Sequence, residues 1–351
     1  MNEQEVTTLK ALMEYEAART APPPSFPSLP DLPGGRYVDP EFFDLEMAQL
    51  WRKSWLFAAH MDEIPDPGSF ILWENVGQPV VIVHSETGAV NAFYNTCSHR
   101  GAPVVTEPKG RKLRLTCRYH GWVYNHEGEL LSIRDPEDFK DLDFGCRSLA
   151  RVRCERFGKL IFINFDDEAP SLLEYLGPLA REWEEFQFDQ CRLAVRHRFV
   201  LDCNWKIAME ANTEVYHVKS IHPSTVAPIL DDRRNVNTLY PNGHNRMIAP
   251  RPQGAFETET MQQRQTMNEI ASVGEIARTC TQSYGVFPNW VSPLSPYALP
   301  PLVPLYDPKS WEPFGFAYVC AILRKSAQFC YMHKSIFKYV FFYCAFSICP
   351  G

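Results

Sequence analysis

Two short fragments, each holding one cysteine and one histidine, constrain the fold of this chain more than any other feature. CSHRGAPV spans residues 97–104 and CRYHGW spans residues 117–122. They pair Cys97 with His99 and Cys117 with His120. Both fragments lie among short β-branched and aromatic runs separated by turn signals, which predict a small all-β unit with the fragments on its turns. Two thiolates and two imidazoles on turns of one unit indicate a metal site.

Tetrahedral zinc and an iron–sulfur cluster can both use two cysteines and two histidines. A single residue separates Cys97 from His99, which is tighter than the usual spacing of zinc-finger cysteines, and no predicted helix presents the paired histidines. In the alternative site, two histidines replace two cysteines on one iron of a 2Fe–2S cluster, which removes negative charge and raises the reduction potential. The pattern favours the cluster, and a zinc-stabilised binding module is the competing interpretation.

A second constellation follows in EANTEVYHVKSIHP, residues 210–223. Residues 204–223 are predicted to form one long helix that a proline ends. Glu214 and His217 would share a face of this helix, whereas His222 lies about 140° further around it. The two histidines can therefore meet at one metal only if the helix bulges or ends between them. Two histidines and one carboxylate are the ligands of non-haem iron(II) oxygenases, and the polar face of a partly buried helix is the alternative interpretation.

The rest of the sequence suggests three regions. Residues 1–39 hold an amphipathic helix followed by a proline-rich linker, residues 40–165 hold a helix over 40–59 and then the all-β unit, and residues 166–351 mix helices with strands. Within the all-β unit, NHEG at 125–128 predicts a hairpin turn, and Trp122 and Tyr124 are expected to pack over the preceding fragment. Residues 235–247 are expected to form a plain loop rather than to line a pocket. A net charge of −7 gives no support for nucleic-acid binding. No apolar run is long enough to span a membrane. The odd number of cysteines, eleven, and the lack of an export signal predict a reducing, cytoplasmic setting.

The cysteine–histidine fragments together resemble the Rieske motif, C-x-H followed by C-x2-H with seventeen residues between. The resemblance implies that Cys97 and Cys117 hold one iron and that His99 and His120 hold the other. The order N-W-K, then E-x-Y-H-x4-H-P, within residues 204–223 is similar to the catalytic segment of Rieske non-haem iron oxygenase large subunits. This second resemblance covers roughly residues 40–300.

The family resemblance implies an α+β fold. A Rieske domain over 40–165 would precede a catalytic domain over 166–351, in which helices cover a large antiparallel sheet of the helix-grip type. His217 and His222 would bind Fe(II). Glu214 falls where the family has an acidic residue, commonly aspartate, that links a cluster histidine of one subunit to an iron-ligand histidine of its neighbour. Head-to-tail homotrimers are implied as well.

The implied activity is that of the oxygenase component in a multicomponent system. Electrons would come from a separate NAD(P)H-dependent reductase or ferredoxin, because the chain has no nucleotide-binding fingerprint. Dioxygen and a small organic substrate would complete the reaction, with ring hydroxylation in aromatic catabolism as the first hypothesis. Mono-oxygenation or demethylation of a quaternary ammonium compound is the alternative, since a glutamate bridge occurs in enzymes acting on such amines. A pure electron carrier is a third interpretation.

The C-terminal region departs from the family pattern. The family's third iron ligand is an aspartate far downstream of the second histidine, but the last aspartate here is Asp307, and no acid follows Glu312. We therefore expect a truncated or divergent C-terminus that lacks the closing strands and leaves the iron site incomplete.

Overall fold

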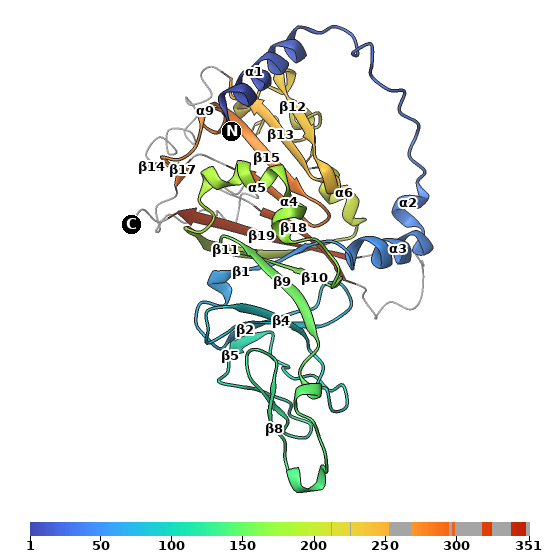
Figure 1. Cartoon of the computed structure of the whole chain (residues 1–351). Helices are drawn as coiled ribbons and strands as arrows, with labels where there is room; N and C mark the ends of the chain where they lie inside the picture. The colour runs from blue at the N-terminus through green and yellow to red at the C-terminus, as the bar shows by residue number, and fades with distance from the viewer. Residues whose placement is uncertain are drawn as a thin grey trace. The chain divides into compact units, whose positions relative to one another are not determined.

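The structure, a computed structural model, describes residues 1–211, 213–224, 226–252, 268–294, 297–298, 318–324 and 338–348. Two compact units make up the chain (Figure 1). The β unit is built around residues 44–172, and the large-sheet unit is built around residues 1–43 and 173–322. The predicted α+β class is confirmed. No helix in the described part is long and apolar enough to cross a membrane.

The β unit contains one seven-stranded sheet and one three-stranded sheet. The seven-stranded sheet has the order β1-β10-β9-β4-β3-β2-β5, and the three-stranded sheet has the order β6-β7-β8. The strands are β1 (Leu56–His60), β2 (Ser69–Trp73), β3 (Val80–His84), β4 (Val90–Tyr94), β5 (Lys109–Arg111), β6 (Leu115–Thr116), β7 (Val123–Tyr124), β8 (Leu130–Ser132), β9 (Arg151–Phe157) and β10 (Leu160–Asn164). Short helical turns accompany them: η1 (Met47–Trp51), η2 (Met61–Glu63), η3 (Pro136–Asp138) and η4 (Gly145–Arg147).

Apolar side chains from both sheets of the β unit form one core. Phe70, Val81 and Phe93 of the larger sheet pack with Leu115 of the smaller one and with Trp122, which directly precedes β7, and all are buried. Truncating such a phenylalanine typically costs about 3–5 kcal/mol. The core therefore holds the strands that flank the two cysteine–histidine loops.

The turn between β7 and β8 is the NHEG hairpin that the sequence predicts. The Gly128 N–H donates to the Asn125 carbonyl at 3.2 Å. Gly128 has φ of +86°, and a β-carbon there would lie 2.3 Å from the ring of Phe93. Glycine is thus required both by the backbone conformation and by the close approach of the core.

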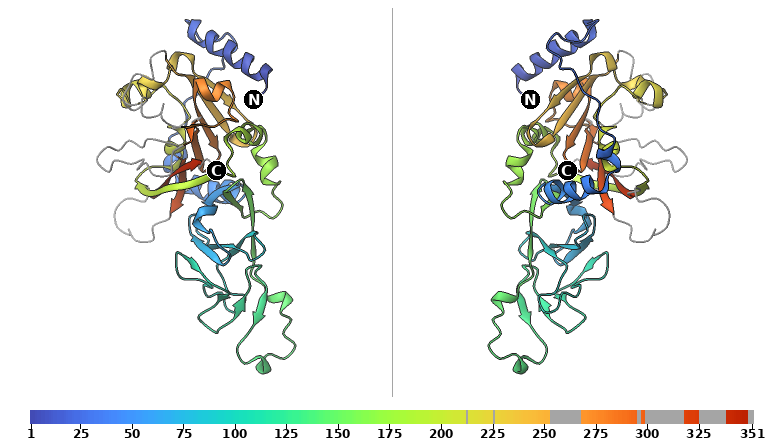
Figure 2. Two further views of the ribbon diagram at one scale, coloured as in Figure 1. Left: turned by 90° about the vertical axis from the view of Figure 1, so that its left-hand side faces the viewer. Right: turned by 90° about the vertical axis from the view of Figure 1, so that its right-hand side faces the viewer.

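The large-sheet unit contains a second seven-stranded sheet, with the order β11-β19-β18-β16-β15-β13-β12. Figure 2 gives two further views of the chain. Its strands are β11 (Cys191–Leu201), β12 (Val236–Leu239), β13 (Asn245–Pro250), β15 (Cys280–Val286), β16 (Trp290–Leu294), β18 (Tyr318–Arg324) and β19 (Lys338–Ile348). A small sheet pairs β14 (Asn268–Glu269) with β17 (Tyr297–Ala298). The short helical turns are η5 (Glu184–Phe186), η6 (Ala227–Ile229), η7 (Asp232–Arg234) and η8 (Pro241–Gly243).

Helices accompany this sheet. They are α1 (Glu3–Ala18), α2 (Gly35–Val38), α3 (Pro40–Glu46), α4 (Leu172–Leu176), α5 (Pro178–Trp183), α6 (Trp205–Glu210), α7 (Val218–Ile221) and α9 (Glu275–Thr279). Helix α1 buries Leu9 and Met13 against Val236 and Ile248 of the β12–β13 hairpin and Ile276 of α9, so the N-terminal helix belongs to this unit.

Three local predictions are wrong. The helix expected over 40–59 ends at Trp51, and Leu56–His60 form strand β1, which is buried at every position. A continuous apolar run has no period that separates a buried strand from a helix.

The segment 235–247, expected to be a plain loop, forms most of the β12–β13 hairpin. The tail was expected to contribute no strands, but β18 and β19 join the sheet, and β19 pairs with the whole of β11.

The composition of β19 accounts for its conformation. KYVFFYCAFSI is rich in aromatic and β-branched residues, which favour strands, and its apolar residues are continuous rather than alternating. Asp307 and Glu312, on which the expectation of an incomplete iron site depends, lie outside the described residues.

Candidate metal centres

The two cysteine–histidine fragments form loops with the same backbone hydrogen bonds. In each loop the cysteine N–H donates to the carbonyl five residues ahead, at 2.8 Å to Ala102 and 2.9 Å to Trp122. The N–H of the glycine four residues ahead donates to the cysteine carbonyl, at 2.8 Å from Gly101 and 2.9 Å from Gly121. Both glycines have positive φ, +72° and +73°, which side chains disfavour. The loops therefore present their cysteine and histidine in equivalent ways.

The four predicted ligands come together as two like pairs. The imidazole rings of His99 and His120 are 4.6 Å apart between centroids. Cys97 and Cys117 are both buried, and their thiols are close enough to interact. Nδ1 of His99 is buried and has no hydrogen-bond partner in the described part of the chain. Paired thiols, paired imidazoles and an unpartnered buried nitrogen fit a 2Fe–2S cluster with two protein ligands on each iron.

Burial shapes the electrostatics of these groups. It raises the pKa of the Cys97 thiol, a hydrogen bond from Tyr124 lowers that pKa, and the neighbouring Cys117 thiol raises it. Burial also lowers the pKa of His99, and the nearby His120 acts in the same direction. A buried thiol needs nearby positive charge to ionise, and bound irons would supply it.

A hydroxyl network surrounds the sulfur of Cys97. Oη of Tyr124 lies 3.1 Å from Cys97 Sγ and 2.9 Å from Ser98 Oγ, and it accepts the Ser98 N–H at 3.2 Å. The Ser98 hydroxyl donates to the Arg147 carbonyl at 2.5 Å. Because that donation uses the only hydroxyl proton of Ser98, the Tyr124 proton must serve either Cys97 or Ser98. Burial raises the pKa of Tyr124 well above its usual range, so this proton stays in place.

The histidine side of the site is enclosed by aromatic rings. The ring of Trp122 stacks on His99, with centroids 4.7 Å apart and planes 4° apart. Phe139 meets both rings edge-on, at 6.2 Å from His99 and 6.1 Å from Trp122. The predicted packing of Trp122 and Tyr124 over the loops is thereby confirmed.

The second constellation lies on a broken helix. Helix α6 ends at Glu210, and the one-turn helix α7 has His217 as its N-cap and His222 as its C-cap. The prediction of one helix over 204–223 is therefore wrong, but the interruption satisfies the condition under which the two histidines can meet. Their rings lie 5.4 Å apart between centroids.

Apolar and polar contacts both fix this turn. Val215 and Val218 are buried against Met247 and Ala249 of β13, which anchors the backbone on either side of His217. A carboxylate oxygen of Glu214 contacts Nδ1 of His217, and its other oxygen accepts the His217 backbone N–H at 3.1 Å. The side chains of His217 and His222 thus provide two nitrogen donors, and Glu214 orients one of them.

Iron(II) in a facial site takes two histidines and one carboxylate. Within the described ranges, no three His, Cys, Asp or Glu side chains are grouped closely enough to hold a single metal ion. His217 and His222 fit two of the positions in such a site, and Glu214 is engaged with Nδ1 of His217.

Comparisons with known proteins agree with this architecture. Residues 54–143 match the family of Rieske 2Fe-2S domains, and residues 188–298 match the ring hydroxylating alpha subunit catalytic domain. The glycine betaine monooxygenase oxygenase subunit of Chromohalobacter salexigens is 31% identical over 57% of this chain and 45% of its own length. The toluate 1,2-dioxygenase subunit alpha of Pseudomonas putida is 32% identical over 53% of this chain and 43% of its own.

Solved structures share the fold. The quaternary ammonium Rieske monooxygenase CntA superposes with a TM-score of 0.69 at 19% identity, over 92% of this chain and 76% of that one. Naphthalene 1,2-dioxygenase from Rhodococcus sp. gives 0.68 at 20% identity, over 98% and 77%. The chain belongs to the large (alpha) subunits of Rieske oxygenases. It spans about 45% of the length of the curated relatives named above.

Sequence reasoning missed several residues that shape the first centre. Asn95, which is buried, accepts the N–H groups of Val104 and Val105 and donates to the Val105 carbonyl, which fixes the end of the first loop. Ser98 was the middle residue of a motif and gave no signal of its own. Asn95 directly precedes the fragment, and a polar residue at the end of an apolar strand could have marked it.

Proposed function

We propose that this chain is the oxygenase component of a multicomponent Rieske oxygenase that inserts oxygen from dioxygen into a small organic substrate. In this proposal the cluster ligands are Cys97, His99, Cys117 and His120, and the mononuclear iron ligands are His217 and His222. The observation that carries it is the pair of equivalent loops that bring two thiols together and two imidazoles to within 4.6 Å. A bound cluster would supply single electrons, and a bound iron(II) would activate dioxygen.

The protein's own part is to position and protect these groups. Tyr124 provides a hydroxyl proton beside Cys97, while Trp122 covers one face of the His99 ring. Glu214 accepts a hydrogen bond from Nδ1–H of His217, which leaves Nε2 unprotonated and available to a metal. The tautomer of His217 is thereby set by its neighbour in the chain.

The proposal includes two partners. Electrons come from a separate NAD(P)H-dependent reductase or a ferredoxin. A head-to-tail homotrimer places the cluster of one subunit beside the iron of the next, with Glu214 as the acidic bridge between the two centres. The contact of Glu214 with His217 supplies one half of that bridge.

Two substrate classes are candidates. Ring hydroxylation of an aromatic compound agrees with relatives such as toluate 1,2-dioxygenase. Oxidation of a quaternary ammonium compound is favoured by a specific observation, the glutamate at 214 in contact with an iron-ligand histidine. The glycine betaine and carnitine monooxygenase subunits among the relatives support the same class.

Anaerobic reconstitution with iron and sulfide, followed by turnover with a chemical reductant or a surrogate reductase, tests the proposal. Reconstituted protein should consume dioxygen and form hydroxylated or demethylated product from benzoate-type or betaine-type substrates, respectively. A His217→Ala variant is the matched control, because it keeps the cluster and loses an iron ligand. A reconstituted protein that holds both metal centres but forms no product from either class would contradict the proposal.

A further inference from the structure

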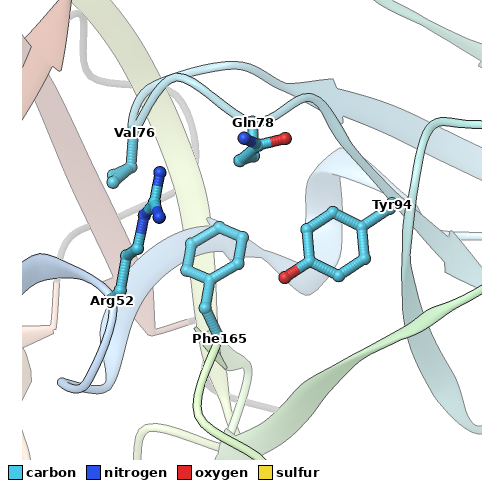
Figure 3. A pocket seen from close by; sticks show the side chains of 5 residues that line it. All are labelled: Arg52, Val76, Gln78, Tyr94 and Phe165. Atoms are coloured by element: carbon cyan, nitrogen blue, oxygen red, sulfur yellow. The ribbon is translucent and has the colours of Figure 1, made fainter. Parts of the chain in front are cut away.

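The β unit contains a pocket that none of the proposed metal ligands lines. Its volume is about 370 Å³, and its lining residues are Arg52, Val76, Gln78, Tyr94 and Phe165. Figure 3 shows the ring of Phe165 between the guanidinium of Arg52 and the ring of Tyr94, with Gln78 across the pocket. This volume lies in the range of small-molecule sites, which hold apolar walls and a few polar groups.

The floor of the pocket is aromatic. The ring of Phe165 lies 5.9 Å from Tyr94 and 6.1 Å from Trp73 between centroids. Phe165 and Tyr94 are half-buried, while Val76 and Trp73 are buried. A planar apolar group could therefore lie against the Phe165 ring and cover mainly apolar surface, so few polar atoms would lose their contact with water.

The polar groups around this floor are unpaired. Arg52, Gln78 and Tyr94 form no side-chain hydrogen bond or ion pair with any described residue, and the indole N–H of Trp73 is buried without a partner there. Surface polar groups are ordinarily satisfied by water, and both Arg52 and Gln78 are exposed enough for water to reach them. What points to a binding site is that a guanidinium, an amide and a half-buried hydroxyl line one pocket around an aromatic floor.

Charge selects the kind of ligand. Burial, chiefly, and the Asp167 carboxylate raise the pKa of Tyr94, while the nearby Arg52 acts in the opposite direction, so Tyr94 keeps its proton as a donor. An anion would be attracted by Arg52 and repelled by Asp167, which places it at the guanidinium and the Gln78 amide. Planar guanidinium groups bind carboxylates with two parallel hydrogen bonds.

We propose that this pocket binds a small aromatic carboxylate. The carboxylate pairs with Arg52 and accepts a hydrogen bond from the Gln78 amide, and the ring lies against Phe165. A quaternary ammonium group in place of the ring would lie close to the guanidinium charge and be repelled by it. The site is separate from the proposed iron centre, and binding to it does not require oxygenase turnover.

The experiment uses the full chain labelled with 5-fluorotryptophan and observed by fluorine NMR. The Trp73 signal is assigned by its loss in Trp73→Phe. Benzoate should shift this signal in a saturable way, and Arg52→Gln should weaken the affinity at least about tenfold, the usual effect of losing a charge-assisted hydrogen bond. Arg114→Gln is the matched control, since Arg114 is an arginine of the same unit that pairs with Glu86 outside the pocket. Its affinity should equal that of the parent.

Three results would overturn the proposal. They are an unmoved Trp73 signal at saturating benzoate, an equal affinity in Arg52→Gln, and an equal response to glycine betaine. The remaining tryptophan signals show in the same spectra that each variant is folded. Because benzoate could also occupy the iron centre, the measurement is repeated in His217→Ala, where the Trp73 response should persist.

Discussion

The hydroxyl of Tyr124 should raise the reduction potential of the cluster, and Tyr124→Phe should lower it. The hydroxyl lies 3.1 Å from Cys97 Sγ, and the ring is fully buried, so phenylalanine removes the donor and keeps the packing. Reduction adds negative charge to the cluster, which strengthens a hydrogen bond to sulfur and so favours the reduced state. Removal of the donor therefore disfavours reduction.

The expected size follows from the strength of one such bond. A hydrogen bond to a charged group contributes about 1.5–3 kcal/mol. About 1–2 kcal/mol of this should differ between the oxidised and reduced clusters, because the added charge is shared over both irons and their sulfurs. For a one-electron couple, 59 mV corresponds to a factor of ten, so the potential should fall by about 40–90 mV.

A redox titration monitored by EPR measures this shift, and Ser98→Ala sharpens the test. Ser98 competes with Cys97 for the Tyr124 proton, so its removal should leave the potential unchanged or slightly higher. Tyr94→Phe is the matched control, because Tyr94 is a half-buried tyrosine of the same unit with no contact to Cys97. An unchanged potential in Tyr124→Phe, or an equal fall in Tyr94→Phe, would refute the reasoning.

Four further predictions concern the large-sheet unit. His217→Ala should reduce the iron content by one ion per chain and leave the sulfide content unchanged, as measured by metal and sulfide analysis. Glu214→Gln should slow cluster reoxidation in single turnover by about 10–100-fold with the potential unchanged, since partners that orient metal ligands typically have effects of this size; an unchanged rate would argue against a bridging role. Glu182→Gln should lower the free energy of unfolding by about 3–5 kcal/mol in urea titrations, because it leaves the buried charge of Arg246, now paired with Glu182 at 2.6 Å, without this counter-ion. Burial lowers the pKa of His244 from 6.5 to about 4, so the unfolded state binds the proton first as the pH falls. The free energy of unfolding should therefore drop by about 2 kcal/mol between pH 7 and pH 5. The His244→Gln variant should lose this pH dependence.

Residue spacing anticipated that the two cysteine–histidine fragments lie close together, but it did not anticipate how His217 and His222 meet. A turn motif carries its geometry in the sequence, because Gly101 and Gly121 provide the positive φ that each loop needs four residues after its cysteine. For the second constellation, the prediction assumed an ideal helix. On such a helix, the five-residue spacing places His217 and His222 on different faces. Buried Val215 and Val218 override helical continuity in the structure, and a helical projection does not include tertiary packing.

Other misses share one physical cause. Strands β1 and β19 are apolar at nearly every position, so their sequences show neither the alternation of a half-buried strand nor the spacing of a helix. Hydrogen bonds between distant segments, such as the one from Ser98 to Arg147, are also invisible to local pattern. The fold class was predictable because it follows from the motifs, whereas the hydroxyl network depends on how the first loop, strand β7 and the turn η4 come together.

The most direct test of this account is the iron and acid-labile sulfide content of the reconstituted chain, measured with its EPR spectrum before and after reduction. We expect two sulfides and three irons per chain, with a cluster signal that appears on reduction and is lost in Cys97→Ser. Protein that stays colourless, retains no sulfide and gives no such signal would contradict the central claim that the two equivalent loops hold an iron–sulfur cluster.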